Sequence, residues 1–194
     1  MDATKMEAGI RLFLEGLGRR FAGDDLDKTP NRVAKAWVDD LVSGYATDPV
    51  AELTFVPAPA VCGPVLAKDI RFASVCVHHL LPFSGLAHVA YLPADRLAGL
   101  SKLGRVVDAL SRRLQIQEHL TGSIAATLDS ALAPRAVLVV LDAEHTCMTL
   151  RGVRKEGSRL LTYAATGLWA SDAAARGEIL DLLAPGRRAL LTNP

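Results

Sequence analysis

The stretch VLAKDIRFASVCVHHLLPFSGLAHVAYL, residues 65–92, decides the fold of this chain. Two runs within it, Val65–Val75 and Leu86–Leu92, are short, rich in β-forming residues and bounded by proline and glycine. This pattern predicts two strands joined by a connecting segment. The segment carries His78 and His79, so we expect both histidines at the end of a strand.

The residues that follow contain two predicted helices, then two predicted strands and a final helix. Apolar residues recur at helical spacing from Ser101, a candidate N-cap, to Leu114, and again from Leu120 to Leu132. Two further strands and a final helix are expected. They are Ala136–Leu141, Ser158–Ala165 and a helix near Asp172–Leu183. The order strands, helices, strands predicts an α+β fold.

The N-terminal part of the chain reads as a helical arm. A first amphipathic helix spans Met6 to Leu17. Thr29 is then expected to cap a second helix that has Pro30 at its first position and ends near Ser43 and Gly44. The proline-rich segment from Asp48 to Pro64 is predicted to be an extended connector. We therefore expect an arm and connector over 1–64 and one compact catalytic unit over 65–194.

Composition excludes several classes of protein. The formal net charge is +1, so no field of the whole molecule attracts nucleic acid or an anionic membrane. No apolar run reaches the roughly 20 residues of a membrane-spanning helix, and the start MDATKMEAG lacks the apolar segment of a secretory signal. Three cysteines do not suggest a disulfide framework. We expect a cytoplasmic protein in which thiols are available for metal binding.

Cysteine and histidine gather in two distant places. Cys76 and His79 lie three residues apart. Cys147 follows far downstream, two residues after His145. Zinc prefers thiolate and imidazole, and a catalytic zinc keeps three protein ligands and one open position. Cys76, His79 and Cys147 match that count. The alternative from spacing alone is that the cysteines are small buried hydrophobes and the histidines ordinary core or surface residues.

Two other clusters offer groups for a nucleotide. Lys102 and Arg105 are three apart, so they share a face near the start of a predicted helix, where phosphate binds readily. Gln117 and Glu118 place an amide beside a carboxylate, a pair that can read the donors and acceptor of guanine. A solvated charged face and a polar helix start are the simpler alternatives.

Taken together, these segments resemble the GTP cyclohydrolase I family. The order and separation of its motifs agree from about Asp24 to Trp169. The motifs that carry the resemblance are Thr29 to Lys35, Cys76 to Phe83, Gly99 to Leu103, Gln115 to Glu118 and His145 to Lys155. The resemblance implies a tunnelling fold, which is an antiparallel sheet with two helices packed on one face, preceded by a helical N-terminal arm. It also implies zinc-dependent opening of the imidazole ring of GTP at C8, with release of formate and formation of 7,8-dihydroneopterin triphosphate.

The resemblance also implies roles for individual residues. The metal ligands are Cys76, His79 and Cys147. The catalytic groups are His78, His145 and Ser101. The substrate-binding groups are Gln117 and Glu118 for guanine, Lys102, Arg105 and Arg151 for the triphosphate, and Arg32 and Lys35 from the arm. The resemblance further implies that the subunits form rings, that the rings stack into a homodecamer and that the active sites lie at subunit boundaries. A homo-oligomer is therefore expected.

One position departs from the family pattern. Val77 stands where the family usually carries glutamate, and neighbours on a strand face opposite ways, so the missing carboxylate belongs beside the ligands and not among them. Losses of that kind cost tenfold to a hundredfold in metal affinity or activity. Two alternatives to the complete reaction stay open: a paralogue that stops at ring opening or uses a modified purine nucleotide, and a non-catalytic nucleotide-binding oligomer.

Overall fold

The computed structural model describes residues 1–18 and 26–183. Within these residues, the main sheet has five strands in the order β5-β2-β3-β6-β7. Every neighbouring pair is antiparallel except β2 and β5. The strands are β2 (Val65–Cys76), β3 (Pro82–Leu92), β5 (Leu114–Gln115), β6 (Ala136–His145) and β7 (Leu160–Gly167).

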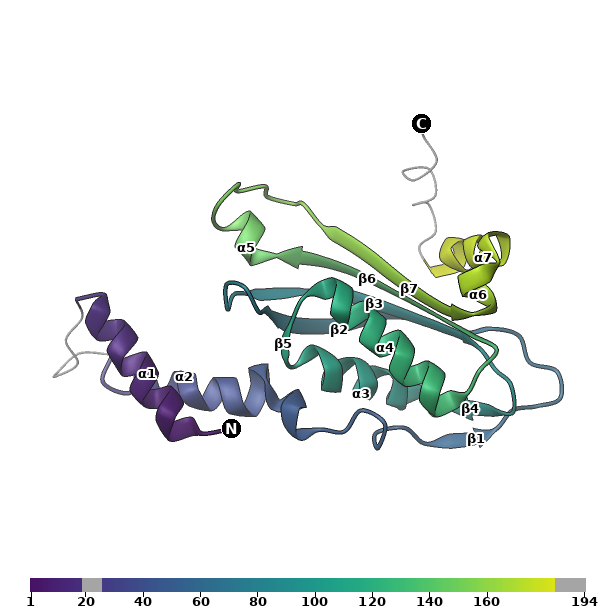
Figure 1. Cartoon of the computed structure of the whole chain (residues 1–194), viewed down its shortest axis with the longest axis horizontal. Coiled ribbons are helices and arrows are strands. Elements are labelled where there is room, and N and C mark those ends of the chain that lie inside the picture. Colours follow the sequence, from purple (N-terminus) through teal and green to yellow (C-terminus); the bar gives the residue numbers. More distant parts are fainter. Residues whose placement is uncertain (19–25, 184–194) are drawn as a thin grey trace.

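Two long helices cover one face of this sheet. They are α3 (Leu100–Ser111) and α4 (Gln117–Leu132), and they pack against β2, β6 and β7 (Figure 1). Ala87, Val89 and Tyr91 of β3 alternate toward them and are buried. This confirms the predicted α+β arrangement of an antiparallel sheet with two helices on one face.

The opposite face is covered at one end by α6 (Leu168–Ser171) and α7 (Ala173–Leu183). Trp169 and Ile179 from these helices pack with Leu138 and Val140 of β6. Strand β6 is therefore buried on both faces, which explains why it reads as a continuous apolar run without alternation.

The helical arm extends from the end of the sheet where the β2–β3 turn lies (Figure 1). It consists of α1 (Ala3–Gly16), α2 (Thr29–Ala36), a π-helical turn η1 (Trp37–Leu41) and a 3-10 turn η2 (Ser43–Ala46). The predicted cap at Thr29 is wrong by one residue, because Lys28 occupies the N-cap without a side-chain bond. The helix does not continue to Gly44. The N–H of Gly44 donates to Arg112 O, and the backbone there packs so closely on α3 that a Cβ at residue 44 would lie 2.3 Å from Ala109 O.

The connector contains one short strand that the sequence did not predict. Strand β1 (Phe55–Pro57) pairs with β4 (Arg96–Ala98) to form a separate two-stranded ribbon. Ser101 was also expected to cap α3, but Gly99 is the N-cap and no side-chain bond closes it. The division at residue 64 stays a prediction, and residues 184–194 of the expected catalytic unit lie outside the described residues.

None of the helices in the described part of the chain has the length and apolarity that a bilayer crossing requires.

Candidate metal centre

The turn between β2 and β3 places Cys76 and His79 on one side of the chain. Strand β2 ends at Cys76, whose main-chain N–H donates to Leu81 O at 2.8 Å and whose carbonyl accepts from Leu80 N at 2.9 Å. Leu80 takes the left-handed conformation, with φ 54°, which lets the chain reverse in so few residues. Cys76 also pairs with Gln115 of β5, so the sheet holds it from its second edge.

Cys147 reaches the same place from the far end of β6. Strand β6 pairs with β3 so that His145 lies opposite Phe83. A single helical turn, α5 (Thr146–Thr149), then follows, and Thr146 Oγ1 donates to Pro82 O at 2.6 Å. This bond ties the start of α5 to the start of β3 and brings Cys147 beside the β2–β3 turn.

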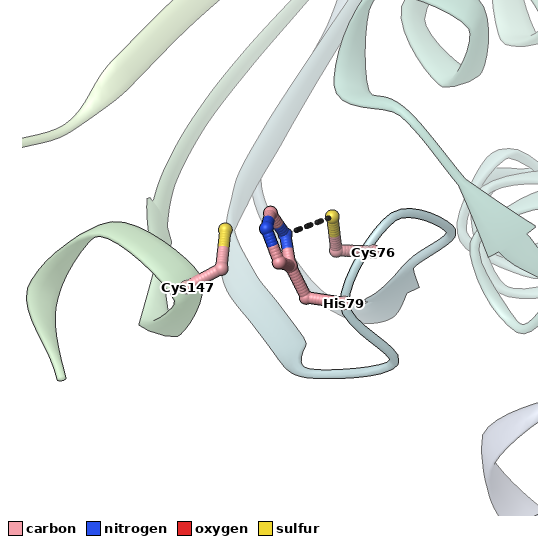
Figure 2. A group of neighbouring side chains, drawn as sticks. All are labelled: Cys76, His79 and Cys147. Carbon is pink, nitrogen blue, oxygen red and sulfur yellow. Dashed lines mark hydrogen bonds between the residues drawn. The ribbon is translucent and has the colours of Figure 1, made fainter. Parts of the chain in front are cut away.

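The donor atoms of Cys76, His79 and Cys147 all lie within 4.8 Å of one another. Figure 2 shows the His79 ring between the two sulfur atoms, with its Nδ1 3.7 Å from Cys76 Sγ. Cys76 is buried, Cys147 is half-buried and His79 is exposed. Two thiols and one imidazole are a donor set that suits zinc, and the exposed side leaves room for water as a fourth ligand. The residues present therefore fit a catalytic zinc.

The surroundings of Cys147 keep its thiol protonated when no metal is bound. Burial raises the pKa of Cys147, and the nearby Cys76 raises it further, while Arg151 lowers it by a smaller amount. Because a metal binds the thiolate, loading this site must release the proton.

His145 is held on two sides. Its Nε2 lies 2.8 Å from Gln117 Oε1, and its ring stacks on Phe83 with centroids 4.4 Å apart and an interplanar angle of 6°. Burial lowers the pKa of His145, and the negative charge of Glu118 opposes that shift. The side chain of His145 is thus held in one orientation, and burial favours its neutral form. It lies at the end of the strand that leads to Cys147.

Other predicted site residues lie around this centre. His78 Nδ1 is 4.0 Å from Cys76 Sγ. Glu118 and Arg151 are exposed, and each lies close enough to act electrostatically on His145 or Cys147. Gln117, in contrast, is fully buried, and its amide bonds within the core.

A second group of predicted residues lies at the other end of the sheet. Ser101, Lys102 and Arg105 occupy the start of α3, which directly follows β4, and Gly99 N bonds to Thr54 O beside them. Strand β3 separates the two ends, because it begins beside the metal centre and ends before β4. Within one chain these three residues therefore do not converge on the three metal donors.

Two of the predicted phosphate-binding cations, Arg105 and Lys35, have local partners. Arg105 forms an ion pair with Glu52 at 3.3 Å. Lys35 on α2 pairs with Asp39, whose hydrogen bond and charge raise the pKa of the lysine. Arg32, on the same helix, is exposed. All of these cations are on the surface, where a ligand can replace their present partners.

A hollow of about 880 Å³ lies next to the metal centre but contains none of its donors. Its lining includes Arg71, Arg112 and Arg159, together with Glu144 and Thr146, which flank His145. Arg159 is already paired with Asp142 at 2.7 Å. The convergence of donor atoms, and not the size of this hollow, identifies the functional site.

Some residues that shape the site were not recognised in the sequence. Phe83, the last residue of the Cys76 motif, stacks on His145, and Thr121 and Thr162 complete the hydrogen bonds around Gln117. The register of β3 against β6 places Phe83 opposite His145, but a single sequence does not show which strands pair or in which register.

The comparisons of sequence agree on one family. The family model described as GTP cyclohydrolase I matches residues 6–184. GTP cyclohydrolase 1 of Streptococcus agalactiae is 47% identical over 186 residues, which cover 95% of this chain and 99% of the relative. GTP cyclohydrolase 1 of Rhodopirellula baltica is 43% identical over 183 residues, 94% of this chain and 80% of the relative. Among solved structures, the apo form of the archaeosine synthase QueF-Like aligns with a TM-score of 0.47 and 20% identity, over 55% of this chain and 96% of that one.

Proposed function

The chain belongs to the GTP cyclohydrolase I family and is a zinc-dependent enzyme of that family, and we propose how its residues divide the work. The reaction opens the imidazole ring of GTP at C8, releases formate and forms 7,8-dihydroneopterin triphosphate, a pterin precursor. The observation that carries the assignment of the site is the convergence of two thiols and one imidazole from distant parts of the chain.

Cys76, His79 and Cys147 are the proposed zinc ligands. When bound, zinc supplies Lewis-acid activation of water near neutral pH, which is what attack on C8 requires. The protein contributes a rigid frame: Cys76 is held by the β2–β3 turn and by β5, and Cys147 by the bond from Thr146 to Pro82. The exposed side of His79 is the side from which the nucleotide would enter.

His78 and His145 are the proposed proton-transfer groups. Ring opening and loss of formate both move protons on and off nitrogen, and imidazole does this best near neutral pH. His145 lies close enough to Glu118 for the two side chains to interact, so a base bound by Glu118 would lie near the imidazole.

Glu118 is the proposed reader of guanine. Guanine presents two adjacent N–H donors on one edge, and an exposed carboxylate accepts both. Gln117, its neighbour, turns inward and so lies behind the base and not beside it. The carboxylate of Glu118 thus accounts for the choice of guanine over adenine, which lacks that pair of donors.

The remaining substrate contacts point to a shared site. Ser101, Lys102 and Arg105, proposed for the ribose and triphosphate, lie at the far end of β3 from the metal centre of their own chain. We propose that a second copy supplies them, with Arg151 contributed beside the metal and Arg32 and Lys35 by an arm. The separation of these residues from the metal donors supports a homo-oligomer, and the homodecamer stays what the resemblance implies. The reaction uses GTP and thiolate ligands, which favours the cytoplasm, where thiols stay reduced.

The activity is tested by incubating zinc-loaded protein with GTP and measuring formate and fluorescent pterin together. Equal amounts of both products are expected. Water attack at C8 first gives a ring-opened formamide, and formate leaves only when that formamide is hydrolysed. Formate without pterin would therefore mean that the enzyme stops before the pterin ring closes. Consumption of GTP with neither product would mean that it stops at ring opening, a possibility that Val77 raises. Neither product, from protein that holds zinc, would refute the proposed reaction.

The shared site has its own test. Cys147→Ser and Lys102→Ala should each be inactive alone, because one loses the metal ligand and the other the phosphate cation. Mixed oligomers made by co-expression should regain part of the activity, since some boundaries then combine an intact metal centre with an intact Lys102. Mixed oligomers that stay inactive would show that both residues serve the same chain.

A further inference from the structure

We propose that Gln117 is a positioning residue for His145. Its side-chain oxygen keeps a hydrogen on His145 Nε2, so that Nδ1 is the nitrogen that exchanges protons with the substrate. This inference rests on the proposed function, in which His145 transfers protons. It assigns to Gln117 a role different from the direct guanine contact expected from the sequence.

The first step is the orientation of the Gln117 amide. Its Nε2 lies 3.1 Å from Leu141 O, 2.9 Å from Leu160 O and 3.1 Å from Thr162 Oγ1. Main-chain carbonyl oxygens only accept hydrogen bonds, so the NH2 group must face them. The carbonyl oxygen Oε1 then faces His145, because the two ends of the amide point in different directions.

Two threonines complete this assignment without conflict. Thr121 Oγ1 donates to the main-chain carbonyl of Gln117 at 2.7 Å. Its oxygen is then free to accept from Thr162, whose hydroxyl lies 2.7 Å away. Thr162 can in turn accept from Gln117 Nε2. Every donor in the set therefore has an acceptor, and reversing the amide would break the arrangement.

The second step is the state of the imidazole. An amide oxygen cannot donate, so the contact of 2.8 Å between Gln117 Oε1 and His145 Nε2 requires the hydrogen on the histidine. This holds whether the ring is neutral or charged. Nδ1 has no hydrogen-bond partner among residues 1–18 and 26–183. Every buried side-chain nitrogen or oxygen in these residues does have a partner, so Nδ1 is not buried. Nδ1 is therefore open to solvent and to a ligand.

The third step is the plane of the ring. Phe83 stacks on His145 at 4.4 Å and nearly parallel, and Phe83 is itself buried. The stack fixes the ring plane, and the bond to Gln117 fixes the rotation within that plane. Together they hold Nδ1 in one direction, which is what an efficient proton transfer needs.

A direct contact between Gln117 and guanine fits the structure less well. The Gln117 side chain is fully buried, and its amide bonds to acceptors in β6 and β7. Turning it toward a base would leave those carbonyl groups and the His145 N–H without partners inside the core. A buried polar group without a partner is costly, so the positioning role is the one that the packing favours.

The hydrogen position is tested by solid-state NMR on zinc-loaded protein labelled with 13C and 15N at histidine. The chain has five histidines, and the His145 signals are those lost in His145→Gln. Nε2 is recognised through its bond to Cδ2, and Nδ1 through its bond to Cγ. We expect His145 with hydrogen on Nε2. Hydrogen on Nδ1 alone would overturn the proposal, and this measurement needs no Gln117 variant.

The kinetic test compares Gln117→Met with Ser111→Ala. Ser111 is the control because its side chain is also buried and donates to Asp108 O at 3.3 Å, with no hydrogen bond to His145. Gln117→Met should lower kcat about tenfold to a hundredfold with KM for GTP within about twofold, and should release the His145 hydrogen from Nε2. Ser111→Ala should keep kcat within about twofold and leave the His145 signals in place.

A direct base contact by Gln117 would instead raise KM at nearly constant kcat, and that result would overturn the positioning role. The two proposals fail separately. Wild-type protein that makes no formate from GTP refutes the proposed function, whereas active protein with hydrogen only on His145 Nδ1 refutes the role of Gln117. If Gln117→Met does not fold, the wild-type spectrum still decides.

Discussion

Replacing Gly85 by alanine should force β3 and β6 apart beside the metal centre. A Cβ at Gly85 would lie 2.0 Å from Asp142 O and 2.6 Å from Ala143 Cα. Both are main-chain atoms of the paired strand, so no side chain can rotate away. Since carbon atoms pack at about 3.5 Å or more, the strands must separate by roughly 1 Å.

The cost follows from that displacement. Inter-strand hydrogen bonds of about 2.9 Å would stretch to nearly 3.9 Å, beyond useful length. Losing about two such bonds costs about 2 kcal/mol, and the residual overpacking adds about 1 kcal/mol or more. For a chain of this size, a loss of about 3 kcal/mol lowers Tm by roughly 6–12 °C. His145 and Cys147 follow on β6 and α5, so zinc affinity and kcat should fall as well.

The assay is thermal unfolding of the zinc-loaded protein by circular dichroism, with zinc content and formate release measured on the same samples. Gly122→Ala is the control, because Gly122 lies within α4 and a Cβ there meets nothing within 4 Å. The control should gain about 0.5–1 kcal/mol from helix propensity. If Gly85→Ala melted within about 2 °C of the wild type and kept its zinc and kcat, the clash argument would be wrong.

Three substitutions and one change of pH test the site further. Cys147→Ser should lose stoichiometric zinc, measured by atomic absorption, and with it formate release, because two protein ligands remain. Glu118→Gln should lower kcat/KM for GTP about tenfold to a hundredfold, since charge-assisted hydrogen bonds to guanine are lost, while zinc content stays at the wild-type value. Val77→Glu should raise zinc affinity by up to about tenfold if the missing carboxylate supports the ligands. Finally, burial raises the pKa of Cys147 in the metal-free protein, so zinc affinity should rise with pH between about 6 and 9 in chelator competition, and a flat profile would contradict this.

The longer elements were predictable from the sequence because their patterns are local. Strands β2, β3, β6 and β7 and helices α3, α4 and α7 were all expected near their observed positions. The short pieces were not. Strand β5 and helix α5 contain too few residues to show a period. They form because distant partners stabilise them, Cys76 for β5 and Pro82 for α5.

The site was predictable in its residue types but not in its geometry. The Cys76 and Cys147 clusters are individually weak zinc signals, and only the pairing of β3 with β6 brings them together. Gln117 shows the limit of pattern reasoning most clearly. Its place beside Glu118 indicated a base contact, yet its position on α4 turns it into the core, where it bonds to His145.

Because the proposed metal ligands and phosphate contacts lie at opposite ends of β3, metal binding needs one chain and turnover needs two. All three proposed zinc donors come from one chain, so a separated chain should still hold the ion. Ser101 and Lys102 lie at the far end of β3 from the metal. If the site is shared as proposed, one chain alone cannot bind the triphosphate next to its own metal. Dilution that separates the copies should therefore abolish formate release before zinc is lost. A site built within one chain would instead keep formate release when the copies separate.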